Sequence, residues 1–141
     1  MPDELSTLRL YMLRGVYLLN FVMLGLNVWP EIISHDKPWD PLPGVAFSFW
    51  AALSVLSGVG VRHPLTMLPL LVLQLFYKAV WLVAVAPSLW SAGRSTGMIR
   101  TFVIASVVLL LLIPWPYVLA RYVKRPGDRW RGAPGPVRAA A

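Results

Sequence analysis

Long apolar segments alternate with short polar or proline-rich segments along this chain. The apolar segments cover residues 9–29, 44–61, 65–86 and 98–120, approximately, and none alternates apolar and polar positions as a half-buried strand does. At about 1.5 Å of rise per residue, each segment falls in the length range of a helix that crosses a hydrocarbon layer of roughly 30 Å. We therefore predict an all-α integral membrane protein. Residues 1–120 would form an antiparallel bundle of four transmembrane helices, and residues 121–141 a basic, Pro- and Gly-rich cytoplasmic tail.

Prolines mark the expected limits of these helices. Pro30 is expected to end the first helix and Pro87 the third, because proline cannot donate the backbone hydrogen bond that continues a helix. Residues 30–43 contain four prolines and are expected to form an irregular loop. Pro69 is expected to bend the third helix mildly, and the Pro-Trp-Pro sequence at residues 114–116 predicts a kink in the fourth.

Composition supports a membrane location rather than a water-soluble fold. Only 13% of the residues are charged and 57% are hydrophobic, whereas average globular chains carry roughly 25% charged residues. The chain has no cysteine, which excludes disulfides, thiolate nucleophiles and cysteine-ligated metal centres. We expect a multi-pass protein of the cell membrane, and its plan is similar to that of many small inner-membrane proteins of bacteria.

The distribution of lysine and arginine predicts which side each loop occupies, because cytoplasmic loops are enriched in these residues. With both termini in the cytoplasm, nine basic residues lie on that side and three outside. The cytoplasmic set is Arg9, Arg14, Arg62, Arg121, Lys124, Arg125, Arg129, Arg131 and Arg138, and the outer set is Lys37, Arg94 and Arg100. The net charge of +7 therefore indicates contact between the basic tail and anionic lipid headgroups rather than binding to nucleic acid.

Polar residues near the middle of the apolar segments are the main candidates for a binding site. Lys78 is the most informative, because a charge at that depth costs several kcal/mol on most scales. Gln74 lies one turn earlier on the same face, and Asn20 and Asn27 share a stripe of the first segment. A ligand site here would favour an anionic or carbonyl-bearing molecule, such as a lipid headgroup, a fatty-acid carboxylate or a quinone. The commoner alternative is that these groups bond to one another and fix the helix packing.

Other candidate positions have simpler explanations. Arg14 would be a second anion contact, but a basic residue so near a helix end more often extends to the headgroups. Glu31, His35, Asp36 and Asp40 are weak candidates for a divalent metal, since their spacing matches no metal motif. We therefore predict no metal site and no cofactor.

Small residues in the second segment predict a close helix contact. Ser54 and Gly58 are four residues apart, so both lie on one helix face, where they permit two backbones to approach. This face would serve packing within the bundle or, less commonly, contact with a second copy.

Residue types that are absent from the apolar segments exclude several classes of membrane protein. None of the four apolar segments contains Asp or Glu, unlike the four-helix exporters that couple drug transport to protons. The histidines, His35 and His63, lie in predicted loops, so a pair of haem-ligating histidines within the helices is excluded. We predict a non-enzymatic membrane subunit or accessory protein, associating with itself or with another membrane protein. The alternatives are a small transporter or carrier of a lipid- or quinone-like ligand centred on Lys78, and a membrane enzyme acting on lipid.

Overall fold

The computed structural model describes residues 5–94 and 96–127, and every regular element in these ranges is helical. The elements are α1 (Thr7–Leu19), the π-helical segment η1 (Asn20–Leu24), α2 (Gly25–Ile33), α3 (Pro41–Arg62), α4 (Leu68–Ala84), α5 (Ala86–Ser91), α6 (Thr96–Leu112), α7 (Trp115–Val118) and the π-helical segment η2 (Leu119–Val123). The all-α prediction is confirmed for this part of the chain. Residues 128–141, most of the predicted tail, lie outside it.

Two of these helices are long and apolar enough to cross a membrane. They are the continuous helix Thr7–Ile33, with 27 residues, and α3, with 22. A third candidate is the pair Gly97–Leu112 and Trp115–Val123, which is bent by 71° at the predicted kink. The apolar helix α4 has 17 residues and is shorter than these spans. By length and composition, two to three helices are therefore candidate transmembrane helices.

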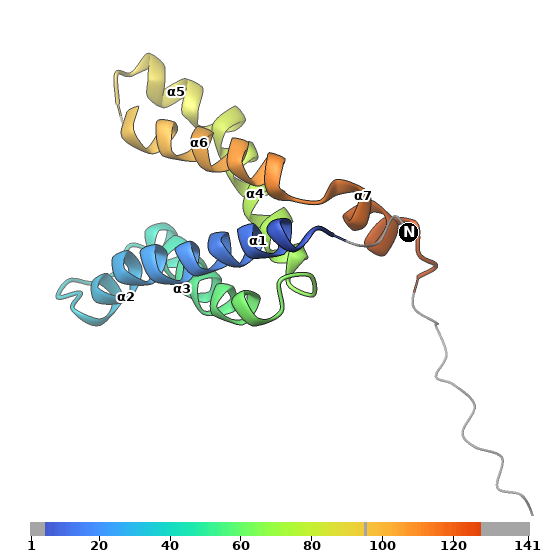
Figure 1. Ribbon diagram of the computed structural model, residues 1–141. Coiled ribbons are helices and arrows are strands. Elements are labelled where there is room, and N and C mark those ends of the chain that lie inside the picture. The colour runs from blue at the N-terminus through green and yellow to red at the C-terminus, as the bar shows by residue number, and fades with distance from the viewer. Residues whose placement is uncertain (1–4, 95, 128–141) are drawn as a thin grey trace, which may run out of the picture.

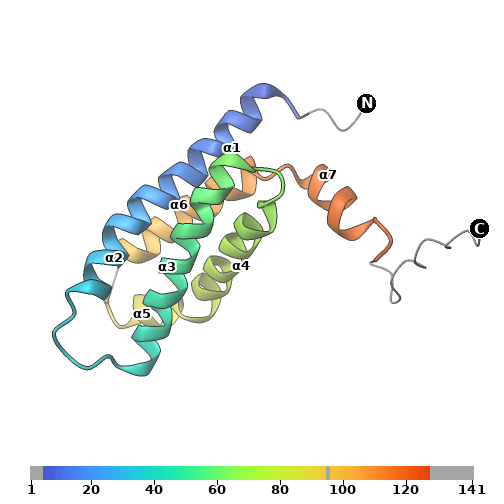
Figure 2. The ribbon, with the colours of Figure 1, turned by 90° about the horizontal axis from the view of Figure 1, so that it is seen from below.

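The long helices pair into two antiparallel hairpins. The helix formed by α1, η1 and α2 packs along α3, and α4 packs along α6. Figure 1 shows the two hairpins diverging from the end of the molecule where α1 begins. In Figure 2, the start of α1, the α3–α4 connection and the α6–α7 junction lie at this same end, and the α2–α3 loop and α5 lie at the other. The buried core is Leu13, Tyr17, Leu53, Leu68, Leu70, Leu71, Leu109, Ile113 and Val118.

Several helix limits differ from the sequence prediction because the prolines fall inside helices. Pro30 does not end the first helix but lies within α2, which continues to Ile33. The helix ends one turn after the proline, where the Ser34 N–H and hydroxyl both donate to the Pro30 carbonyl, at 2.9 and 2.6 Å. The helix α3 begins at Pro41 rather than near residue 44, since a proline in the first turn of a helix removes no hydrogen bond.

The limits of the second hairpin are shifted for the same reason. The helix α4 begins at Leu68 rather than near residue 65, because residues 64–67 form a turn. Pro69 therefore lies in the first turn of α4 and not in its second. Pro87 starts the short helix α5 instead of closing the preceding one, so helix continues to Ser91.

Candidate functional site

A polar contact joins the two hairpins halfway along their length. Asn20 Nδ2 donates a hydrogen bond to Gln74 Oε1 at 3.0 Å, which connects η1 to α4. Gln74 is 3% exposed, and Lys78, one turn further along α4, is 7% exposed. Within the described ranges, Lys78 Nζ has no hydrogen bond and no ion pair, and it lies 5.5 Å from the ring centroid of Tyr77. Of the residues predicted for the site, the structure thus brings Asn20 and Gln74 together, with Lys78 beside them.

Helix geometry explains why these side chains share a level. Gln74 and Lys78 are four residues apart, so both lie on one face of α4, on which Leu71 is also buried. Asn20 begins the π-helical segment, and such segments occur frequently at functional sites. In the same segment, the Phe21 carbonyl accepts a hydrogen bond from Ser54 Oγ of α3 at 3.1 Å. The π-helical turn therefore receives one polar contact from each hairpin.

Aromatic rings hold α3, α4 and α6 together near this level. The Tyr77 ring packs edge-on against Phe49 at 5.3 Å and against Phe102 at 6.0 Å, and Phe102 also contacts Trp81 at 4.9 Å between centroids. One turn along α6 from Phe102, Ser106 Oγ is enclosed and has no hydrogen-bond partner among the described residues. Among the described residues, this hydroxyl is the fully enclosed side-chain polar atom that lacks a hydrogen-bond partner.

Two of the predicted binding residues lie away from this group. Asn27 is exposed, and its Nδ2 donates to the Met23 carbonyl of its own helix at 2.6 Å. Arg14 is exposed, with its guanidinium 5.8 Å from the ring centroid of Tyr11. Neither is placed to share a ligand with the enclosed Lys78.

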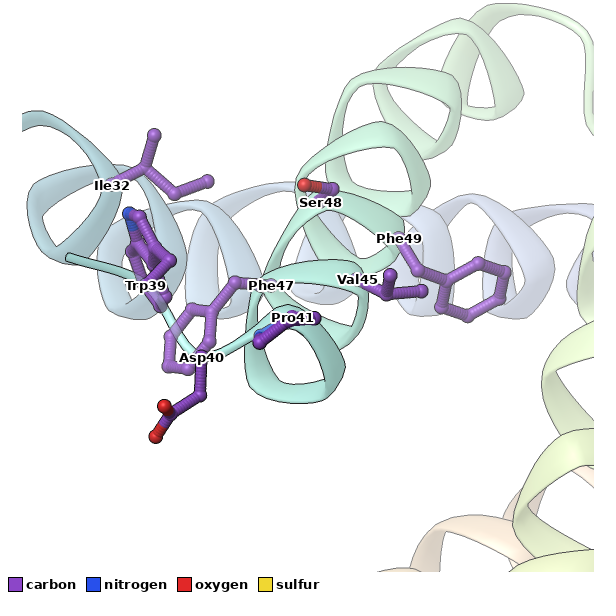
Figure 3. Close-up of a pocket in the computed structure, with 9 residues that line it drawn as sticks. Ile32, Trp39, Asp40, Pro41, Val45, Phe47, Ser48 and Phe49 are labelled. Carbon is purple, nitrogen blue, oxygen red and sulfur yellow. The ribbon is translucent and has the colours of Figure 1, made fainter.

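The α2–α3 loop forms a small aromatic surface. Glu31 Oε1 lies 3.3 Å from His35 Nδ1, and the His35 ring stacks on Trp39 with centroids 3.7 Å apart. Trp39 and Phe47 line a shallow groove at the start of α3, and the Asp40 carboxylate points away from both rings (Figure 3). In the part of the chain that the structure describes, no three histidine or acidic side chains are grouped to hold a metal ion.

Arg9 has a role that the sequence analysis did not identify. Its guanidinium donates to the carbonyls of residues 111–113 at 3.3–3.5 Å, and Trp115 Nε1 donates to the Leu110 carbonyl at 2.8 Å. Pro114 and Pro116 have no N–H to donate to the Leu110 and Leu112 carbonyls, and α6 ends at Leu112, so the carbonyls at this end lack their usual helical partners. The spacing of the prolines predicts that carbonyls at this end are unpaired. It does not predict which distant side chain donates hydrogen bonds to them.

The fold therefore defines a small helical protein with candidate transmembrane helices and an enclosed polar group between two hairpins. Comparison of the chain with models of known families, with curated proteins and with solved structures found no match.

Proposed function

We propose that this chain is a multi-pass membrane protein in which all four long helices cross the bilayer. Large apolar side chains point outward on each of them: Leu26 is 69% exposed, Val59 46%, Phe76 69% and Leu111 70%. In water, apolar surface of this extent is unfavourable, whereas a hydrocarbon layer solvates it at no cost. The same argument covers α4, because α5 follows it directly and lengthens the helical path across the layer.

The proposed topology places both termini in the cytoplasm. Arg9, Arg62 and Lys124 lie near one end of the hairpins, and Lys37 and Arg94 near the other. The excess of basic residues at the first end supports its assignment to the cytoplasm.

Cysteine labelling tests this topology without background, since the chain has no cysteine of its own. We expect Lys37→Cys to react with a membrane-impermeant maleimide added to intact cells. Arg62→Cys and Lys124→Cys should react only after the membrane is permeabilised. Reaction of Lys124→Cys in intact cells, at the rate seen for Lys37→Cys, would refute the orientation. Full recovery of the protein from the soluble fraction would refute the membrane assignment itself.

Within the membrane, we propose a non-enzymatic role as a subunit or accessory protein of a larger assembly. The observation that supports this role is the divergence of the two hairpins, which meet chiefly at the cytoplasmic end (Figure 1). A second membrane protein, or a second copy of this chain, would contact the diverging ends of the hairpins and hold them at a fixed angle.

Native mass spectrometry of the protein extracted into lipid nanodiscs directly from its own membrane tests this role. The expected result is a single assembly of fixed stoichiometry, containing this chain and at least one further polypeptide. A population consisting of monomers alone, stable after extraction, would contradict the proposed role while leaving the topology intact.

A further inference from the structure

We infer that the enclosed Lys78 side chain, together with Gln74, binds the carboxylate of a single-chain amphiphile, the chemistry of a fatty acid. This inference rests on the proposed membrane location. Lys78 is 7% exposed and Gln74 3%, and both lie on the face of α4 that meets η1. They lie where a hydrogen bond between the Asn20 and Gln74 side chains joins the two hairpins.

The positive charge of Lys78 has no acidic residue to pair with in the four apolar segments. None of the four apolar segments contains Asp or Glu, so the chain cannot supply a carboxylate at this depth. Placing an ammonium group within a hydrocarbon layer is costly unless an opposite charge or strong acceptors accompany it. A bound carboxylate supplies both, because it carries a negative charge and about four lone-pair positions.

The other free polar groups at this level also act as donors. Gln74 Oε1 already accepts from Asn20, and the Gln74 amide nitrogen donates no hydrogen bond to any described residue. Ser106 Oγ is enclosed and unpaired, and it lies one turn from Phe102, whose ring contacts Tyr77 and Trp81. Because α4 and α6 are antiparallel, that turn of about 5.4 Å brings Ser106 roughly level with Gln74. The Lys78 ammonium and the Gln74 amide nitrogen can only donate, and the Ser106 hydroxyl can donate, so together they suit a ligand composed of acceptors.

Depth favours a carboxylate over a phospholipid phosphate. Lys78 is ten residues from the start of α4 and six from its end, about 15 and 9 Å along the helix axis at 1.5 Å per residue. A phosphodiester carries two substituents and a large hydration shell, both of which would have to enter the apolar layer. A fatty-acid carboxylate stands at the end of a single acyl chain. Binding it therefore brings a smaller polar group into the apolar layer than binding a phosphodiester would.

Equilibrium binding of radiolabelled oleate to the full chain in neutral detergent tests the inference. Wild type is expected to bind oleate saturably, at one molecule per chain. Lys78→Met should weaken binding at least about tenfold, the loss expected when a hydrogen bond to a charged group is removed. Lys78→Arg, which keeps the charge, should retain most of the affinity. Equal oleate binding by wild type and Lys78→Met would overturn the assignment.

Matched controls separate this site from other sources of binding. Arg14→Met removes a positive charge from an exposed position on α1 and should leave oleate binding unchanged. Methyl oleate should not compete, since it lacks the negative charge. Competition by methyl oleate, or equal competition by dioleoylphosphatidylglycerol dissolved in the same detergent, would overturn the carboxylate site.

Labelling of the cysteine variants at Lys37 and Lys124 keeps the two proposals distinguishable. Absence of oleate binding with the expected labelling pattern refutes the ligand site alone. An altered labelling pattern refutes the membrane topology on which the site rests.

Discussion

Replacing Gly60 with alanine is expected to destabilise the folded chain by about 2–4 kcal/mol, the combined cost of overpacking and of a weakened buried hydrogen bond. A Cβ atom at position 60 would overlap the Tyr17 ring, which is 0% exposed and cannot move outward. The same ring is fixed at its far end, where the Tyr17 hydroxyl donates to the Pro64 carbonyl at 3.0 Å. Any shift that accommodates the new methyl group therefore weakens the packing of α1 against α3.

Gly15→Ala is the matched control for this prediction. A Cβ at Gly15 meets no atom within 4 Å, so the substitution should be neutral or stabilise α1 by up to about 1 kcal/mol through helix propensity. Both variants can be unfolded with increasing fractions of dodecyl sulfate in mixed micelles, with tryptophan fluorescence as the signal. Coincident unfolding curves for Gly60→Ala and Gly15→Ala would show that the Tyr17 ring leaves room for a methyl group at position 60.

Arg9→Met is expected to cost about 2 kcal/mol, the range of hydrogen bonds to a charged group. The guanidinium is the donor that the structure places on the carbonyls of residues 111–113, where α6 ends. Methionine keeps the apolar length of the side chain but donates no hydrogen bond, so these carbonyls would be left without that partner. The loss should appear as a lower midpoint of thermal unfolding in detergent.

Arg14→Met removes an arginine from the same helix and serves as the control for Arg9→Met. Because Arg14 is exposed and forms no hydrogen bond or ion pair with the described residues, its replacement should change stability by less than about 0.5 kcal/mol. Equal losses in the two variants would mean that the contribution of Arg9 comes from general charge and not from the α6 carbonyls.

Local pattern was enough to predict the helical class, the kink at residues 114–116 and the buried polar face of Gln74 and Lys78. It failed for Asn27, which the sequence placed on one stripe with Asn20. The π-helical segment at Asn20–Leu24 contains more residues per turn than an α-helix, so positions after it are rotated relative to those before it. Spacing along the sequence cannot reveal that rotation, because the apolar residues surround the helix on nearly every side.

The helix limits were missed for a related reason. Pro41, Pro69 and Pro87 all lie in first turns, where the absent N–H removes no helical bond. Pro30 lies inside the helix Thr7–Ile33, which ends one turn later. The partner of Arg9 depends on contact between residues about a hundred positions apart, which no local pattern encodes. The number of transmembrane spans and the identity of a ligand stay predictions, to be decided by the labelling and binding experiments.

The helix α6 has 17 residues, about 25 Å at 1.5 Å per residue, before the chain turns by 71°. The helix Thr7–Ile33 has 27 residues, about 40 Å by the same measure. An average hydrocarbon layer of roughly 30 Å matches neither length, so a bilayer around this protein would have to thin beside α6 while the longer helix tilts. Such hydrophobic mismatch favours lipids with short acyl chains next to the second hairpin.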